Sequence, residues 1–232
     1  MLTSAILILH IVSGFLALGC GAIAIVAKKG KWMHVRSGRI YFWSMMWVAI
    51  TAIYLSVANT IPFLFLIAIF SFYLTWTGYR SVYWKNKCLP KVIQWFDTTL
   101  SHITALFGVG MITLAILSLF DIHLDETISS LNIVLLVFGI GTSLFAGEDL
   151  LLFYRKKGSS NFLWMYTHIG RMLGAYIATV TAFLVVNAEF FPSLLFAWLG
   201  PTIIGSPLIV YWIRTYRNKL EPKSVNWIPG SP

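Results

Sequence analysis

Seven long apolar runs divide the chain, and short polar segments separate them. The runs cover residues 2–27, 40–58, 63–79, 98–120, 128–154, 164–186 and 193–213. About 20 apolar residues form a helix long enough to cross the hydrocarbon core of a bilayer, and the third run is the shortest of the seven. A turn at Asn59-Thr60-Ile61-Pro62 joins the second and third runs as a tight hairpin. The pattern predicts an all-α, polytopic transmembrane helical bundle with seven spans.

The composition supports this fold class. The 232-residue chain is 58% hydrophobic and only 11% charged, whereas a soluble domain carries about 25% charged residues. The net charge of +9 does not indicate nucleic-acid binding, because the basic residues stand in short clusters between the apolar runs. The predicted partner is therefore the lipid bilayer. The first run has no basic segment before it and continues to the lysines, so we expect a span there rather than a cleaved signal.

The distribution of charge predicts the orientation. All 17 lysines and arginines fall in four clusters, at residues 28–39, 80–91, 155–171 and 214–223, which seven spans place on one side. The opposite side holds Asp121, Asp125, Glu126 and Glu189 and no basic residue. By the positive-inside rule the basic side is cytoplasmic, so the N-terminus lies outside and the C-terminus inside. A six-span chain would put several clusters on the wrong side. We expect one seven-helix domain at residues 1–217 and a short cytoplasmic tail at 218–232.

Polar residues inside the spans gather near the cytoplasmic side, where each costs free energy unless it faces a partner or a cavity. Some have simpler roles, since Asp97 can cap the fourth span and His34 can be an interfacial group. Glu148 and Asp149 point about 100° apart on a helix, so only one of them faces the bundle. Because many such residues coincide in depth, we predict a common ligand, cofactor or proton site. The residues are His34, Arg39, Asp97, His102, Glu148, Asp149, His168 and Arg171.

Two of these stretches resemble each other. The segments His34-Val35-Arg36-Ser37-Gly38-Arg39 and His168-Ile169-Gly170-Arg171 both place a histidine shortly before Gly-Arg at the start of a helix. An arginine offers a fixed fork for an anionic group, or it reaches lipid phosphates by snorkelling, which makes anionic lipid head groups a second predicted partner. We expect His102, His168, Arg171 and one of Glu148 or Asp149 to share a cavity that opens toward the cytoplasm.

Several motifs along the chain carry a resemblance to a known family. They are His34-x-x-Ser37-Gly38-Arg39-x-Tyr41, Trp76-Thr77-Gly78-Tyr79-Arg80 and His168-Ile169-Gly170-Arg171-Met172, together with His10-Ile11 and Gly14 in the first span. The chain resembles a family of bacterial integral membrane proteins, common in the Bacteroidetes lineage, that is classed only as a domain of unknown function. The resemblance covers most of the chain. It implies a location in the bacterial inner membrane, and it brings no known reaction.

Three functions fit the predicted site. The first is a b-type haem or metal-binding redox protein, in which His34 and His168 bind haem b while Arg39 and Arg171 bind its propionates. The second is an intramembrane zinc hydrolase with ligands drawn from His34, His102, His168, Glu148 and Asp149. No span carries the His-x-x-x-His pair of seven-span hydrolases such as alkaline ceramidases. The third is a transporter or proton-coupled carrier, although Pro201 and Pro207 break only the last span. The haem hypothesis ranks first.

Overall fold

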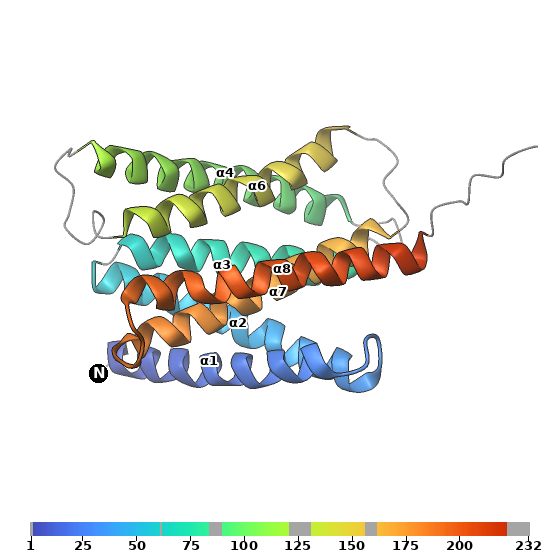
Figure 1. Ribbon diagram of the computed structural model, residues 1–232, viewed down its shortest axis with the longest axis horizontal. Coiled ribbons are helices and arrows are strands. Elements are labelled where there is room, and N and C mark those ends of the chain that lie inside the picture. Colours follow the sequence, from blue (N-terminus) through green and yellow to red (C-terminus); the bar gives the residue numbers. More distant parts are fainter. Residues whose placement is uncertain (1, 61, 84–89, 121–130, 156–161, 222–232) are drawn as a thin grey trace, which may run out of the picture.

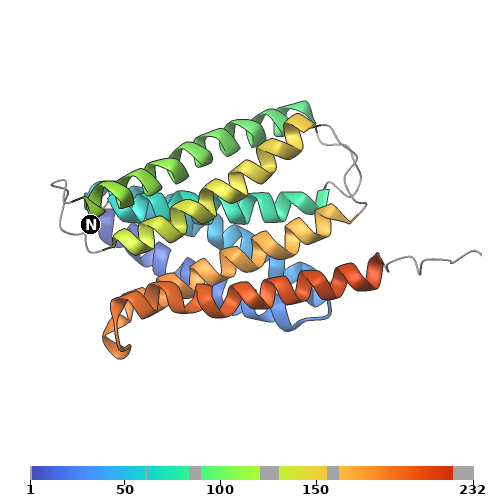
Figure 2. The same cartoon turned by 45° about the horizontal axis from the view of Figure 1, so that its top comes forward.

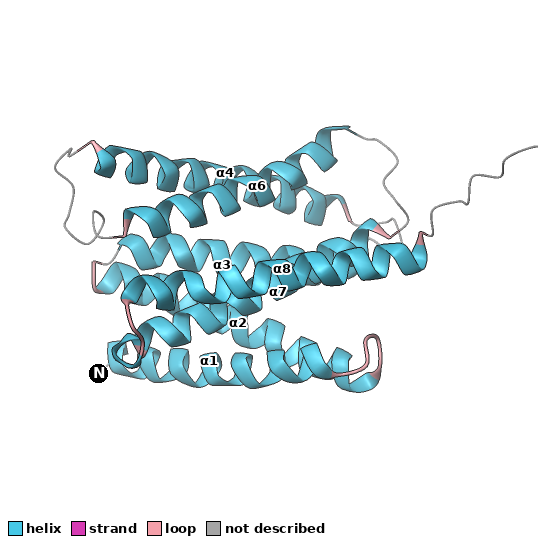
Figure 3. Ribbon diagram, in the orientation of Figure 1, coloured by secondary structure: helices cyan, strands magenta, loops and turns pink. Residues whose placement is uncertain are grey.

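The structure is a computed structural model that describes residues 2–60, 62–83, 90–120, 131–155 and 162–221. Within these ranges the chain forms α-helices and one short 3-10 helix, η2 (Ala188–Phe190), and no strand (Figure 3). The seven α-helices are α1 (Leu2–Val26), α2 (Trp32–Ala58), α3 (Pro62–Ser81), α4 (Lys91–Leu119), α6 (Asn132–Arg155), α7 (Leu163–Val186) and α8 (Leu194–Leu220). The predicted all-α fold is confirmed.

The helices run in alternate directions along one common axis (Figure 1). Three antiparallel pairs, α1 with α2, α4 with α6 and α7 with α8, surround a central helix, α3. Helix α3 contacts α2, α4, α6 and α7, and Figure 2 shows it between α4 and α7 in a second view. As a result, α1 begins at one end of the bundle and α8 finishes at the other. The ends of α1, α3, α6 and α8 all lie at that second end, together with the starts of α2, α4 and α7.

Six of the helices in the described part of the chain are long and apolar enough to cross a membrane: α1, α2, α4, α6, α7 and α8. Helix α3 is not among them. Its last two turns carry Thr75, Thr77, Arg80 and Ser81, all of them buried, which lower its hydropathy. A helix that is enclosed by other helices can carry such residues because it does not face lipid. The structure therefore places a helix with several buried polar residues at the centre of the bundle.

Several helices extend beyond the apolar runs that predict them. Helix α2 begins at Trp32 instead of residue 40, α4 begins at Lys91 instead of residue 98, and α8 ends at Leu220 instead of residue 213. An apolar run marks the hydrocarbon layer, whereas helical hydrogen bonds can continue into the polar interface. The predicted role of Asp97 as a helix cap is therefore wrong. Pro90 occupies the N-cap position of α4, and Asp97 lies about 9 Å along the helix from Lys91 at 1.5 Å per residue.

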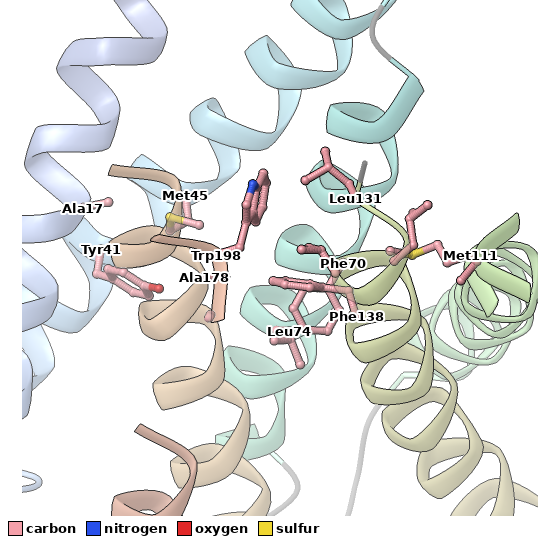
Figure 4. Close-up of a cluster of buried hydrophobic side chains, with 14 residues drawn as sticks. Ala17, Tyr41, Met45, Phe70, Leu74, Met111, Leu131, Phe138, Ala178 and Trp198 are labelled. Carbon is pink, nitrogen blue, oxygen red and sulfur yellow. The ribbon is translucent and has the colours of Figure 1, made fainter. Parts of the chain in front are cut away.

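An apolar core holds the helices together (Figure 4). Phe70 of α3 packs edge-to-face on Phe138 of α6, with ring centroids 5.3 Å apart, and Phe138 packs in the same way on Trp198 of α8 at 6.0 Å. Toward α1 and α2 the core continues through Tyr41 and Met45. Outside this core many large apolar side chains are exposed on the helices. An apolar exterior of this kind suits lipid rather than water.

Candidate functional site

Helix α3 presents a polar face to α4 and α6. Tyr73, Trp76 and Arg80 are spaced by three and four residues, so they lie on one side of the helix. Opposite them, α4 places Asp97 and Ser101 on its own buried face. Asp97 and Ser101 are four residues apart, so they also lie on one side of their helix. The sequence of these two helices therefore brings acidic, basic and hydroxyl groups together inside the bundle.

Arg171 and Asp149 form the first ion pair of the site. Nη2 of Arg171, on α7, lies 3.3 Å from Oδ1 of Asp149, on α6, and both side chains are almost fully buried. The same Nη2 donates a hydrogen bond to the carbonyl oxygen of Phe145 at 2.8 Å, and the guanidinium stacks over the Phe145 ring. The hydroxyl of Tyr73 donates a hydrogen bond to Oδ2 of Asp149. Three helices thus hold this carboxylate in place.

Arg80 and Asp97 form a second buried ion pair. Nε of Arg80 lies 2.9 Å from Oδ1 of Asp97, and the indole N–H of Trp76 donates to the same oxygen at 2.9 Å. Ser101 connects the two pairs, because its hydroxyl donates to the backbone carbonyl of Asp97 at 2.8 Å and lies 3.2 Å from the Tyr73 hydroxyl. We call the following set the buried charge network: Tyr73, Arg80, Asp97, Ser101, Asp149 and Arg171.

The buried charge network balances two arginines with two aspartates, and this balance makes its burial tolerable. Glu148 adds one further negative charge at its edge. Oε2 of Glu148 lies 3.4 Å from Nη2 of Arg171, and its side chain is 66% exposed, compared with 1% for that of Asp149. Arg171 therefore contacts a buried carboxylate and an exposed one at nearly equal distances.

Two atoms of the network keep unused hydrogen-bonding capacity. Nη1 of Arg171 and Oδ2 of Asp97 are buried and have no hydrogen-bond partner among the residues that the structure describes. Buried polar atoms are nearly always paired with protein or with water. A water molecule beside either atom would complete its hydrogen bonding.

The two histidines that the haem hypothesis selects do come together. The rings of His34 and His168 lie with centroids 6.3 Å apart and are nearly perpendicular. Nδ1 of His34 lies 2.9 Å from the carbonyl oxygen of Ala24, and Nδ1 of His168 lies 2.9 Å from that of Gly78. A proton on each Nδ1 makes these contacts hydrogen bonds and leaves Nε2 with a lone pair. This is how proteins orient histidines that ligate metals.

His102 does not join them. It is exposed on α4, where its Nδ1 bonds to the carbonyl oxygen of Thr98 and its Nε2 lies 3.2 Å from the hydroxyl of Tyr154. Neither contact reaches His168 or Arg171, and the cavity shared by these three residues stays a prediction. Among the described residues no group of three or more histidine, cysteine or acidic side chains could hold a metal ion. The ligand set drawn from His34, His102, His168, Glu148 and Asp149 is thus not assembled as one zinc site.

The two arginines of the haem hypothesis have different surroundings. Arg171 already pairs with Asp149 and Glu148 through Nη2, while its Nη1 has no described partner. Arg39 is exposed on α2. Of the four predicted haem-binding residues, His34 and His168 are in ring contact with each other.

Three members of the site escaped prediction from the sequence: Tyr73, Trp76 and Arg80. From the sequence, Arg80 is a charge that indicates topology, Tyr73 belongs to an apolar run, and Trp76 and Arg80 belong to a motif of the family resemblance. Their spacing of three and four residues, which places them on one side of a helix, is the signal that could identify them as a site. Some of the charged residues that predict the orientation lie outside the described residues. They are Lys85, Lys87, Asp121, Asp125, Glu126, Lys156, Lys157 and Lys223.

A comparison of the chain with known protein families, with functionally characterised proteins and with solved structures found no match. The functional conclusion therefore rests on the residues and their geometry.

Proposed function

We propose that this protein is a proton-coupled carrier of the bacterial inner membrane, with Asp149 as its proton-binding group. The observation that carries the proposal is the position of Arg171 between two carboxylates. Its Nη2 lies 3.3 Å from buried Asp149 and 3.4 Å from exposed Glu148. When Asp149 takes up a proton, Arg171 keeps Glu148 as a negative partner. The guanidinium charge is then compensated in both protonation states.

This compensation matters because an unpaired charge inside a protein is strongly destabilising, by about 3–5 kcal/mol when one partner of a buried pair is removed. A carrier must visit both states of its proton site at accessible cost. With Glu148 beside Arg171, protonation of Asp149 does not leave an isolated buried cation. Because Glu148 is exposed, the pair it forms with Arg171 links the buried proton site to the surface of the bundle.

The hydroxyls of Tyr73 and Ser101 extend the path of the proton. Tyr73 bonds to Asp149 and lies within hydrogen-bonding distance of Ser101, which bonds to the backbone of Asp97. Each hydroxyl can both donate and accept a hydrogen bond, so a proton can move between Asp149, Tyr73 and Ser101 by rotation of O–H groups, and the carbonyl oxygen of Asp97 ends the series. The series connects α6 with α4 through α3. It crosses the centre of the bundle instead of remaining at one helix pair.

The proposal includes the seven-span topology with its basic side in the cytoplasm, and membership of the bacterial family that the motifs resemble.

Proton uptake by reconstituted vesicles tests the proposal. The protein is placed in liposomes that contain a pH-sensitive dye, and a potassium diffusion potential set with valinomycin drives protons inward. We expect faster acidification than in protein-free liposomes, and we expect Asp149→Asn to abolish the difference. Glu189→Gln serves as the matched control, because Glu189 is an exposed carboxylate in η2 and belongs to no part of the network. Wild-type vesicles that acidify no faster than empty ones would refute the proposal.

Glu148→Gln provides a second readout with a defined sign. Without Glu148, protonation of Asp149 leaves Arg171 with no negative partner, so a higher proton concentration is needed. Uptake should therefore persist, with its pH dependence displaced toward acid. An unchanged pH profile in this variant would contradict the role of the shared arginine.

A redox centre held by His34 and His168 is the second candidate function, and their 6.3 Å ring separation favours it. Bound haem would supply one-electron chemistry. The purified protein should then show a Soret band that is lost in His34→Ala and in His168→Ala. His102→Ala should keep the band, since His102 is an exposed residue of α4 whose ring bonds to the carbonyl oxygen of Thr98 and not to the histidine pair. A colourless, metal-free wild-type protein would remove this candidate and leave the carrier proposal untouched.

A further inference from the structure

A groove of about 550 Å³ lies on the exposed surface between α1 and α2, away from the buried charge network. Its floor contains the small side chains Ser13 and Ser44, both buried. Its volume falls within the range of about 300–1,000 Å³ that is typical of ligand sites. The apolar side chains that line it are Leu9, Val12 and Leu16 from α1 and Ile40, Trp43 and Trp47 from α2.

Two exposed tryptophans line the groove. Trp43 and Trp47 are 63% and 51% exposed, and they lie about 4 Å and 10 Å beyond the start of the apolar run at residue 40, at 1.5 Å per residue. Exposed side chains within an apolar run face lipid. Large flat side chains that flank a floor of serines form a trench that can hold a flexible apolar chain.

One charge stands at the end of this trench. Arg39 is the lining residue nearest the start of α2, it is exposed, and it lies about 10 Å along the helix from Trp32. No described carboxylate forms a salt bridge with it. Arg39 comes directly before the apolar run that begins at residue 40, so it lies at the edge of the hydrocarbon layer, where an arginine can reach a lipid phosphate. Tyr79 of α3 interacts with Arg39 electrostatically and adds a hydroxyl beside the guanidinium.

We propose that this groove binds one phospholipid with an anionic head group. Its phosphate meets the Arg39 guanidinium, and one acyl chain lies in the trench between Trp43 and Trp47. The charge at one end of the groove and the apolar walls along the rest of it match the two parts of such a lipid. The site depends on the helices standing in a membrane, and it does not depend on proton transport by the network.

Native mass spectrometry of the detergent-solubilised protein tests this site. The protein is titrated with phosphatidylglycerol, which is anionic, and with phosphatidylcholine, which has no net charge. We expect one molecule of phosphatidylglycerol to bind more tightly than phosphatidylcholine. Arg39→Gln should lower the affinity for phosphatidylglycerol about tenfold, which is the usual effect of losing one hydrogen bond to a charged group.

Arg36→Gln is the matched control. Arg36 lies one turn nearer the start of α2, stacks over the Trp32 ring with its guanidinium 5.0 Å from the centroid, and does not line the groove. Its replacement should leave the affinity unchanged. Trp43→Ala should weaken both lipids, because it removes one wall of the acyl trench. Equal losses in Arg39→Gln and Arg36→Gln would show a diffuse surface charge effect and overturn the proposal, as would no loss in Arg39→Gln.

Discussion

Glu148 and Asp149 are neighbours in the sequence, and yet their side chains have opposite surroundings. Glu148 is 66% exposed and Asp149 is 1% exposed. Successive residues of a helix turn by about 100°, so adjacent carboxylates cannot share one environment. The buried face of α6 includes Leu135, Phe138, Thr142 and Asp149. Leu135 lies two heptads before Asp149, but buried Val134 lies two heptads before Glu148, so the spacing of apolar residues alone does not identify which acid points inward.

Asp97 shows where such reasoning fails. Its position before two threonines is typical of a helix cap, and only the start of α4 at Lys91 reveals that it lies inside a helix. Its partner, Arg80, belongs to a different helix. Local sequence cannot identify a contact that depends on how two helices pack. The pairing of the two buried ion pairs is therefore information that comes from the tertiary structure alone.

Replacement of Asp97 tests whether Arg80 depends on it. Asp97→Asn removes the negative partner of a buried arginine, and the free energy of unfolding should fall by about 3 kcal/mol. The double variant Asp97→Asn with Arg80→Gln removes both charges, so it should be more stable than the single variant. Thermal unfolding in detergent, followed by circular dichroism, measures both effects. If the double variant loses as much free energy of unfolding as Asp97→Asn and Arg80→Gln lose together, the two side chains do not act as an ion pair.

At the scale of the elements, α3 departs furthest from expectation. Its run of apolar residues is the shortest, and over the residues that the structure describes it is not one of the six helices long and apolar enough for a span. In the structure it is the central helix, in contact with α2, α4, α6 and α7. Hydropathy measures suitability for lipid, and a helix surrounded by protein is released from that requirement. The run predicts the helix correctly, whereas its central position follows only from packing.

Helices α4 and α6 pack through small residues. Ser101, Thr104, Gly108, Met111 and Ala115 follow one another on the buried face of α4 with the four-and-three spacing of a packing seam. Small residues allow two helix backbones to approach closely, and close packing drives association in membranes. A Cβ atom added at Gly108 would lie 2.9 Å from the backbone nitrogen of Ser143 and 3.1 Å from the carbonyl oxygen of Gly139. The two backbones leave no room for it.

Gly108→Ala should therefore destabilise the protein by about 1–3 kcal/mol, the usual cost of overpacking. Gly110→Ala is the matched control on the same helix, because a Cβ at Gly110 would meet nothing within 4 Å. That substitution should be neutral or stabilising by up to about 1 kcal/mol, since alanine is the better helix former. The midpoint of thermal unfolding in detergent distinguishes the two. Equal midpoints would show that the seam between α4 and α6 does not limit stability.

At the scale of the whole molecule, charge and geometry agree on one arrangement. The segment between α1 and α2, the end of α3, the start of α4 and the end of α8 lie at the same end of the bundle (Figure 1). Lys28, Arg80, Lys91 and Lys219 belong to these segments. Counting charges along the sequence was sufficient to predict that these ends lie together. The charge pattern does not predict which polar side chains meet inside the bundle. His102 and His168 each lie about one turn into their apolar runs, yet they have different neighbours in the structure.

The number of spans determines where the C-terminus lies, and reporter fusions can measure it. In the seven-span topology α3 crosses the membrane, so residues 121–130 lie outside and Pro232 lies in the cytoplasm. If α3 did not cross, every later segment would change sides. Alkaline phosphatase, which is active only outside the cytoplasm, should therefore be active when inserted at residues 121–130 and inactive when fused after Pro232.

A third insertion at Gly30 supplies the control for this experiment. Gly30 lies between α1 and α2 and has a φ of +74° in a short loop, and it precedes α3, so its side does not depend on whether α3 spans. The reporter should be inactive there in either case. Activity after Pro232 together with inactivity at residues 121–130 would show six spans. That result would leave the basic residues that follow α6 on the outer side, against the positive-inside rule, and this conflict is the physical reason to expect seven.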